Sequence, residues 1–299
     1  MKRLAAILAA VVCLPACSGS PAAPAPVTGG SGGISTPVTP ALPASFVGAG
    51  DIADCGPGAE LTAKLLDRLD GTVFTTGDNA YPSGSAAEFR DCYQPAWGRH
   101  RQRTRPVPGN HDYHQADAAP YFEYFGRNAG PAGLGYYSYS LGAWHIVALN
   151  SEIDVRSGSP QVQWLRTDLA AHPAACTAVY WHRAAFSSGH HGSDARMLDV
   201  WHAMHDFGVD LAIVGHDHMY ERFAPQDRTG RIDHVRGIRQ FVVGTGGAPV
   251  RPVHSLHPNS EAAASTWGVI AFTLEADGYR WRFISTDGSF SDEGATGCH

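Results

Sequence analysis

The sequence lacks a basic stripe, a paired-cysteine motif and any long apolar run. Its 22 Lys and Arg residues are outnumbered by 28 Asp and Glu residues, and the arginines are scattered along the chain. Because a nucleic-acid backbone selects clustered positive charge, we expect no nucleic-acid-binding surface. No CxxC spacing occurs, which argues against a zinc–cysteine site. No period of about 20 to 50 residues recurs, which argues against a repeat protein.

Two motifs of common enzyme classes are also missing. Ser187-Ser188-Gly189 does not form the pattern of a nucleophile elbow, and no Gly-rich phosphate loop precedes a helical segment. The sequence therefore does not favour catalysis by a serine nucleophile.

The N-terminal segment has the pattern of an export signal. Lys2 and Arg3 precede an apolar run, Leu4 to Val12, which is too short to span a bilayer. The run is followed by LPAC, which resembles a bacterial lipobox and predicts a signal peptide over residues 1–17 with acylation of Cys17. The alternative is a plain signal peptide cut further on. Either way we expect an exported protein, which is a cell-surface or periplasmic lipoprotein or is secreted, with membrane association only through a lipid anchor.

Residues 18–44 are almost wholly Ser, Gly, Pro, Ala and Thr, a composition that predicts a disordered tether. Residues 45–299 are long enough for one large α/β domain.

Four cysteines follow the signal segment, and an even number in an exported chain indicates two disulfides. Three pairings are possible. We favour Cys55 with Cys92, which flank one early βαβ segment, and Cys176 with Cys298, which would tie down the C-terminal tail.

Short apolar runs alternate with amphipathic segments and predict an α/β fold. The predicted strands lie in residues 45–50, 71–77, 104–110, 144–150, 177–182 and 210–216, and the predicted helices in 59–69, 85–97, 159–172 and 195–207. The part after residue 218 is strand-rich, with a hairpin expected around Asp277-Gly278.

Polar side chains follow five of these strands, at the edge where α/β proteins form sites. The residues are Asp51, Asp78, Asn110 with His111, His182, and His216 with His218. Each alone has an ordinary explanation as a cap or turn residue, but the ordered set does not. With Tyr81 they offer seven ligands, which suits two metal ions that share a bridging carboxylate.

The ordered blocks resemble the calcineurin-like metallophosphoesterases, and within them the purple acid phosphatase branch. The blocks are Asp51-Ile-Ala, Gly77-Asp78-Asn-Ala-Tyr81, Gly109-Asn110-His111-Asp112, Val179-Tyr-Trp-His182 and Gly215-His216-Asp-His218. The resemblance implies a four-layer αββα sandwich of two mixed β-sheets flanked by helices. Most of the superfamily has a ligand histidine at the position of Ala53, which has no donor atom. In the purple acid phosphatase branch a tyrosine at the position of Tyr81 supplies a phenolate instead.

The resemblance also implies ligand sets and roles. Fe(III) would take Asp51, Asp78, Tyr81 and His218, and Zn(II), Fe(II) or Mn(II) would take Asp78, Asn110, His182 and His216. A hydroxide between the ions would be the nucleophile. His111 would protonate the leaving oxygen, or else serve as a structural histidine, and Asp112 could orient it. His191 is favoured over His190 as a substrate contact, while His114, His145, His202 and His205 are expected to be packing or surface residues.

The function implied is a metal-dependent phosphatase that acts on small phosphomonoesters. The alternative within the same chemistry is a phosphodiesterase for nucleotides or glycerophosphodiesters. The alternative of another class is a non-catalytic metal- or phosphate-binding surface lipoprotein. The sequence does not define the substrate or the oligomeric state.

Overall fold

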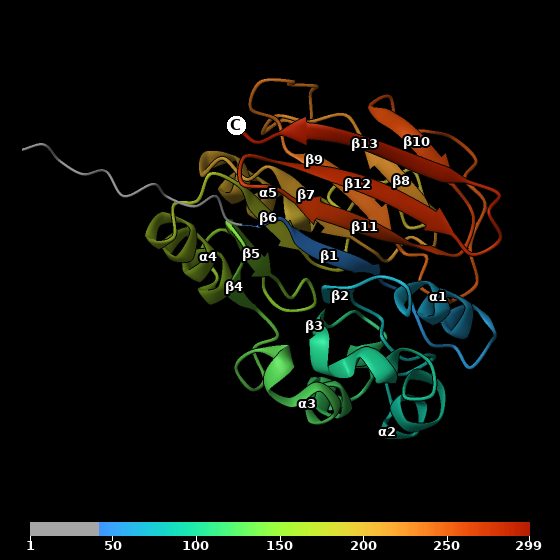
Figure 1. The fold of residues 1–299 in the computed structure, drawn as a ribbon. Helices are drawn as coiled ribbons and strands as arrows, with labels where there is room; N and C mark the ends of the chain where they lie inside the picture. The colour runs from blue at the N-terminus through green and yellow to red at the C-terminus, as the bar shows by residue number, and fades with distance from the viewer. Residues whose placement is uncertain (1–41) are drawn as a thin grey trace, which may run out of the picture. The chain divides into compact units, whose positions relative to one another are not determined.

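The computed structural model describes residues 42–299, which fold around two mixed β-sheets (Figure 1). The six-stranded sheet has the order β13-β12-β11-β1-β2-β3, and the seven-stranded sheet has the order β10-β8-β9-β7-β6-β5-β4. The strands are β1 Ala44–Ala49, β2 Thr72–Thr76, β3 Thr104–Val107, β4 Tyr137–Leu141, β5 Trp144–Ala148, β6 Thr177–Tyr180, β7 Leu211–Val214, β8 Tyr220–Phe223, β9 Arg239–Val243, β10 Ser260–Ala264, β11 Gly268–Leu274, β12 Gly278–Ser285 and β13 Ser291–Gly297.

Helices pack on the outer side of each sheet and complete the four layers. α4 and α5 cover the seven-stranded sheet, while α1, α3 and the short helices η1 and η2 cover the six-stranded sheet. The helices are α1 Gly58–Leu66, α2 Ala86–Glu88, η1 Phe89–Tyr93, η2 Trp97–Arg103, η3 Asp112–His114, η4 Ala116–Ala118, α3 Ala119–Phe125, η5 Gly126–Ala129, α4 Pro160–Ala171, η6 Ala195–Met197 and α5 Leu198–Asp206. The predicted αββα sandwich is therefore confirmed.

The two sheets are held face to face by an aromatic core. Phe46 of β1 and Phe74 of β2 lie with ring centroids 4.5 Å apart, and Phe74 lies 5.9 Å from Tyr180 of β6 in the other sheet. All three side chains are fully buried. Aromatic side chains bury large apolar areas, and this packing holds the facing sides of the two sheets together.

The predicted elements before residue 218 are found, with one difference. The segment 85–97 is not one α-helix, because α2 passes into the π-helix η1, which places Phe89, Cys92 and Tyr93 in the core. Such π-turns insert a residue into a helix and turn its buried face. The predicted C-terminal hairpin is β11 and β12, while α3, β4, β8, β10 and β13 were not predicted.

Both disulfides join the pairs that the sequence favours. Cys55 pairs with Cys92, with Cα atoms 4.6 Å apart, and Cys176 pairs with Cys298, with Cα atoms 5.5 Å apart. The second bond ties the end of β13 to the start of β6 across 122 residues of sequence. Two disulfides are compatible with a protein outside the cytoplasm.

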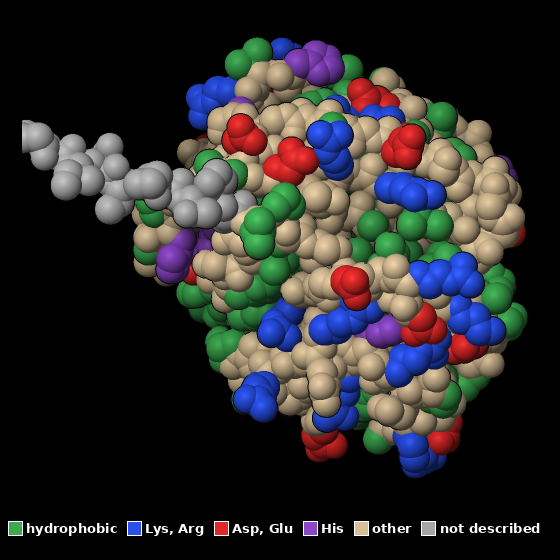
Figure 2. Space-filling view, viewed as in Figure 1, with side chains coloured by type: hydrophobic (Ala, Val, Ile, Leu, Met, Phe, Trp, Pro, Cys, Tyr) green, Lys and Arg blue, Asp and Glu red, His purple; other side chains and the backbone are tan. Residues whose placement is uncertain are grey.

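The surface in Figure 2 mixes charges of both signs. Ion pairs join residues of opposite sign at the surface: Arg99 pairs with Asp67 at 2.8 Å and with Glu60 at 2.8 Å. Among residues 42–299 no helix is long and apolar enough to cross a bilayer. The predicted signal peptide, Cys17 and the tether up to residue 41 lie outside the described residues.

Candidate metal centre

Seven polar side chains meet where strands of both sheets end. They follow β1, β2 and β3 of one sheet and β6 and β7 of the other. Asn110 is half-buried and the other six are buried. The set is Asp51, Asp78, Tyr81, Asn110, His182, His216 and His218.

The backbone at these positions is held in an uncommon conformation. Asp51, Asp78 and His216 have positive φ angles of 59°, 50° and 70°. Left-handed non-glycine residues are uncommon and cluster at functional sites, where the surrounding structure holds them. The glycines beside them allow close approach, since a Cβ atom on Gly109 would lie 2.2 Å from Oδ1 of Asp78. The glycine of the GN motif therefore makes room for the Asp78 carboxylate, and Gly77 of the GD motif makes room for His182, since a Cβ atom there would lie 2.7 Å from Nδ1 of that residue.

The first group of donors surrounds the Tyr81 hydroxyl. Its oxygen lies 2.8 Å from Oδ1 of Asp51, 3.0 Å from Oδ2 of Asp78 and 3.2 Å from Nε2 of His218. Tyr81 is positioned by its backbone N–H, which donates to the carbonyl of Ala53 at 2.8 Å. Ala53, whose side chain has no donor atom, thus positions Tyr81 through its main-chain carbonyl.

The second group of donors surrounds Nε2 of His182. This atom lies 3.1 Å from Oδ1 of Asn110, 3.1 Å from Nδ1 of His216 and 3.3 Å from Oδ2 of Asp78. Asp78 therefore contributes the same oxygen, Oδ2, to both groups.

The other oxygen of each carboxylate is occupied by the backbone. The N–H of His216 donates to Oδ2 of Asp51 at 2.9 Å, and the N–H of His111 donates to Oδ1 of Asp78 at 2.8 Å. Each carboxylate is thus fixed in orientation and keeps one oxygen directed at the cluster.

Backbone carbonyls also fix the tautomers of two histidines. Nδ1 of His182 lies 2.8 Å from the carbonyl oxygen of Thr76, and Nδ1 of His218 lies 2.9 Å from that of Pro249. A carbonyl only accepts, so in both rings Nδ1–H donates to it and Nε2 is the nitrogen that faces the cluster. Such an outer hydrogen bond is the usual support of a metal-binding histidine.

The electrostatics of the cluster show a need for positive charge. Burial and the charges of Asp51 and Asp78 raise the pKa of Tyr81 well above its usual value. Burial opposes the charge on His182, but the Asp78 carboxylate outweighs it and raises the pKa of His182 to about 10. Two buried carboxylates this close together need a cation beside them to offset their charge. The oxygen and imidazole donors of the cluster are the kinds that bind metal ions in proteins.

His111 lies at the rim of the cluster and faces it. Its Nδ1 lies 2.6 Å from the carbonyl oxygen of Pro82, so Nδ1–H donates there, and its Nε2 lies 3.9 Å from Oδ2 of Asp78. The side chain is 29% exposed, which leaves it accessible to a substrate.

Asp112 does not orient His111, which corrects the expectation from the sequence. Its Oδ2 accepts from the N–H of Gly109 at 2.9 Å and from Nδ2 of Asn79 at 3.0 Å. Asp112 is fully buried beneath the loop, and burial with the nearby Asp78 charge raises the pKa of Asp112 to about 7. It supports the loop that carries Asn110, while the Pro82 carbonyl orients His111.

His191 stands beside the second donor group, and the exposed His190 directly precedes it in the loop. The rings of His191 and His216 stack with centroids 4.1 Å apart. The His191 N–H donates to Oδ1 of Asp217 at 2.7 Å, so a residue between the two HxH histidines anchors this loop.

Sequence reasoning missed Arg183, whose guanidinium contacts the cluster. Its Nη1 lies 3.1 Å from Nε2 of His216, and its Nε lies 2.9 Å from Oε1 of Glu152. The sequence feature that could have indicated Arg183 is its position directly after His182, a predicted metal ligand.

A second group of metal-type residues lies at the start of β5. His145 Nε2 lies 2.7 Å from Oδ2 of Asp168, and Nδ1 of His172 lies 2.9 Å from the Asp168 carbonyl oxygen. The two rings stack at an interplanar angle of 19°, and Nδ1 of His172 must carry a proton to donate to the carbonyl. This geometry describes a polar contact that holds α4 against β5, in line with the expected packing role of His145.

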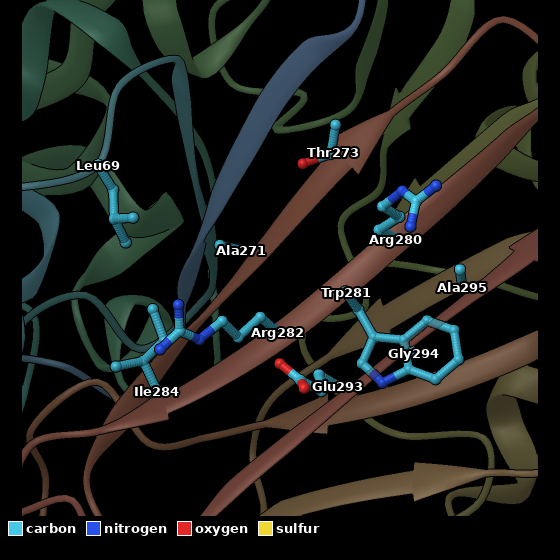
Figure 3. Close-up of a pocket in the computed structure, with 10 residues that line it drawn as sticks. All are labelled: Leu69, Ala271, Thr273, Arg280, Trp281, Arg282, Ile284, Glu293, Gly294 and Ala295. Carbon is cyan, nitrogen blue, oxygen red and sulfur yellow. The ribbon is translucent and has the colours of Figure 1, made fainter.

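A shallow pocket of about 550 Å³ opens on the outer face of the six-stranded sheet (Figure 3). Its lining includes Arg280, Arg282 and Glu293, and none of the seven donor residues. It is therefore separate from the candidate metal centre.

Comparison with known proteins agrees with this geometry. The profile of the calcineurin-like phosphoesterase family matches residues 44–220, which contain all seven donors. The chain belongs to this family. The description of this family is that of a phosphoesterase, and the buried group of Asp78, His182 and His216 is of a kind that could hold a metal ion.

The relatives point to the purple acid phosphatase-like branch of the family. Purple acid phosphatase 15 of Arabidopsis thaliana is 26% identical over 221 residues, which cover 60% of this chain and 42% of the relative. An uncharacterized protein of Mycobacterium tuberculosis is 27% identical over 206 residues, covering 57% and 38%. The chain thus spans less than half the length of these curated relatives.

Solved structures show the same fold. A purple acid phosphatase from yellow lupin seeds superposes with a TM-score of 0.72 at 18% identity, covering 86% of this chain and 54% of that one. The GAP50 anchor of the Plasmodium inner membrane complex superposes with a TM-score of 0.68 at 15% identity, covering 86% and 90%.

Proposed function

We propose that this protein is a binuclear-metal phosphomonoesterase of the purple acid phosphatase type. The observation that carries the proposal is Oδ2 of Asp78, which lies in both donor groups at once. A carboxylate shared in this way holds two cations at the short separation used for in-line phosphoryl displacement.

The two donor groups differ in chemistry, and this suggests different ions. Asp51, Asp78, Tyr81 and His218 would hold Fe(III), because a phenolate is a hard anionic ligand. Asn110, His182 and His216, with Asp78, would hold Zn(II), Fe(II) or Mn(II), since imidazole suits divalent transition metals. When bound, the ions lower the pKa of water and neutralise phosphoryl charge.

The residues of the chain supply the rest of the reaction. His111, oriented by Pro82 with Nε2 toward the cluster, would give a proton to the leaving oxygen. His191, stacked on His216, would contact the substrate. Asp112 would keep the Asn110 loop in place from beneath.

For location we propose export through residues 1–17, a lipid on Cys17 and a tether over residues 18–44. The mass of the N-terminal peptide from membranes of the producing cell would test this, because acylation adds the mass of the fatty chains.

The first experiment compares hydrolysis of para-nitrophenyl phosphate with that of its bis ester by metal-reconstituted protein. We expect the monoester to be preferred. Asp78→Asn should abolish activity, whereas Asp154→Asn, which changes a surface carboxylate paired with Arg156, should leave it intact.

Each other outcome has a defined meaning. Preference for the bis ester would replace the phosphatase proposal by a phosphodiesterase. Two bound metals without hydrolysis of either ester would contradict both and favour a binding protein on the same scaffold.

A further inference from the structure

β13 is an edge strand whose outer side is free. It ends the six-stranded sheet, and its neighbour there is β12. Within residues 42–299 no main-chain hydrogen bond joins Ser291–Gly297 to a segment other than β12. Five of the seven residues of the strand are exposed, so its outer side is accessible. An edge of unpaired N–H and C=O groups is a template for a further strand.

The other three sheet edges are shorter or interrupted. β3 has four residues and contains Pro106, which has no N–H, and β4 has five residues. β10 has a register shift between Ser260 and Ala262, which is typical of a bulge. β13 has seven residues in unbroken register with β12 and contains no proline, lysine or arginine. Natural edge strands use those devices to prevent pairing, and β13 has none of them.

Main-chain bonds at the start of β12 show which groups of β13 point outward. The N–H of Cys298 donates to the carbonyl of Asp277 at 2.9 Å. The next residue, Gly278, instead bonds toward β11, since its carbonyl accepts from Glu275 at 2.8 Å. The direction of these bonds alternates along an antiparallel strand. The residues of β13 that direct their N–H and C=O groups away from β12 are therefore Ser291, Glu293, Ala295 and Gly297.

The charges beside this edge suit a second copy of the same strand. Arg282 of β12 lies opposite Glu293. Arg280 of β12 lies opposite Ala295. All four residues line the pocket on the outer face of the sheet (Figure 3). Arg280 is 65% exposed and paired with Glu275 at 2.9 Å, and such an exposed pair is weak enough to be exchanged for another carboxylate.

One antiparallel register satisfies the backbone and the charges together. A twofold axis between the two copies of Gly294 puts Glu293 of each strand opposite Ala295 of the other. The outward N–H and C=O groups of the two strands then pair along their whole length. Each Glu293 lies between Arg282 of its own chain and, across the small Ala295, Arg280 of the other chain. An axis at Glu293 would instead place two carboxylates opposite each other, which is unfavourable.

We propose that β13 pairs with β13 of a second copy of this chain and joins the two six-stranded sheets into one. The interface is isologous, because each strand offers the same residues to the other. None of the seven donor residues takes part, so the proposal does not depend on the proposed function. A strand edge is smaller than a standard protein interface, and the dimer should therefore dissociate on dilution.

Sedimentation velocity of the full-length protein over a range of concentrations measures the association. We expect a change from monomer to dimer as the concentration rises. Ala295→Pro should raise the dissociation constant of the dimer by about tenfold or more, because the dimer loses a main-chain donor from each strand. Proline is tolerated there in the monomer, since the N–H that it removes points away from β12. Ala295→Ser keeps that N–H and should leave the dissociation constant unchanged.

A charge exchange tests the register. Ala295→Glu places a carboxylate opposite Glu293 of the other chain, and Glu293→Lys places a cation among the arginines, so each should weaken the dimer. The double variant E293K/A295E puts opposite charges across from each other and should bind more tightly than either single variant. All variants share one N-terminus, so a lipid on Cys17 would affect each alike. The unfolding temperature of each variant checks its fold.

Hydrogen exchange locates the interface. In the dimer the amides of Glu293 and Ala295 should exchange more slowly than at low concentration, while the amide of Gly294, which bonds to β12, should not change. A protein that stays monomeric at every concentration would overturn the proposal. A dimer with the same dissociation constant in folded A295P and A295E would also overturn it, because its interface would then lie elsewhere.

Discussion

The phenol oxygen of Tyr81 lies 2.8 Å from Oδ1 of Asp51, although the two residues come from loops after different strands. Without a cation, the phenol keeps its proton, because burial and the carboxylates raise the pKa of Tyr81 well above its usual value. A trivalent ion in this position would reverse the effect and favour the phenolate. The same contact is thus unfavourable for an ionised tyrosine alone and suited to a tyrosine bound to a metal.

This relationship predicts the colour of the iron-loaded protein. A tyrosinate bound to Fe(III) should give a visible charge-transfer band, and Tyr81→Phe should abolish it. Tyr124→Phe, which changes a tyrosine bonded to Gln94 away from the cluster, should keep the band. A colourless wild-type protein with full iron content and full activity would contradict the ligand role of Tyr81.

His111 should matter most when the leaving group is poor. We expect His111→Asn to lower kcat by about 10²-fold or more for an alkyl phosphate, because general acid catalysis contributes this much. The loss should be smaller for para-nitrophenyl phosphate, whose phenolate leaves without a proton.

The matched control for this prediction is His114. Its Nδ1 lies 3.2 Å from the same Pro82 carbonyl, and its ring lies 4.7 Å from that of His111. If His114→Asn had the same dependence on the leaving group, or if His111→Asn affected both substrates equally, His111 would not be the acid.

The sequence indicates the position of each donor but not how each is held. The apolar runs predict strands, and the polar residues after them predict one edge, because parallel strands share a carboxyl end. Sequence does not show that Thr76, Pro82 and Pro249 supply the carbonyls that orient the histidines. Those contacts depend on tertiary packing. Every residue has a carbonyl oxygen, so the residue type does not indicate which carbonyl will accept the bond.

The role predicted for Asp112 and the omission of Arg183 are errors with the same physical origin. Asp112 follows His111 in sequence, yet it bonds to Gly109 and Asn79, since the tight loop turns its side chain inward. Arg183 reaches His216 only because β6 and β7 are neighbours in the sheet. Local spacing therefore predicts which residue types gather at the edge, while the sheet pairing decides their contacts.

The disulfide between Cys176 and Cys298 should stabilise the fold more than the one between Cys55 and Cys92. They close segments of 122 and 37 residues, and loop entropy predicts about 5 kcal/mol for the longer and about 1 kcal/mol less for the shorter. Urea unfolding of the two paired Cys→Ser variants would measure the difference. A larger loss for the Cys55 and Cys92 variant would show that native-state packing outweighs loop entropy.

The contact of His299 with Asp210 should make stability depend on pH. His299 Nδ1 lies 2.6 Å from Oδ1 of Asp210, and this hydrogen bond raises the pKa of His299 above its usual value. A raised histidine pKa means that the folded state holds the proton more tightly. Its stabilisation is therefore complete below the unfolded value of about 6.5 and is lost as pH rises through the folded pKa.

The wild-type protein should accordingly exceed His299→Gln in free energy of unfolding by more at about pH 5.5 than at about pH 9. Urea unfolding of both proteins at the two pH values measures this. Asp210→Asn should remove the pH-dependent part of the difference, because the charged partner is gone, even though the amide can still bond to the N–H of Thr177. If the wild-type and His299→Gln proteins differ by the same amount at both pH values, the hydrogen bond stabilises the fold in its neutral form and His299 does not take up a proton on folding.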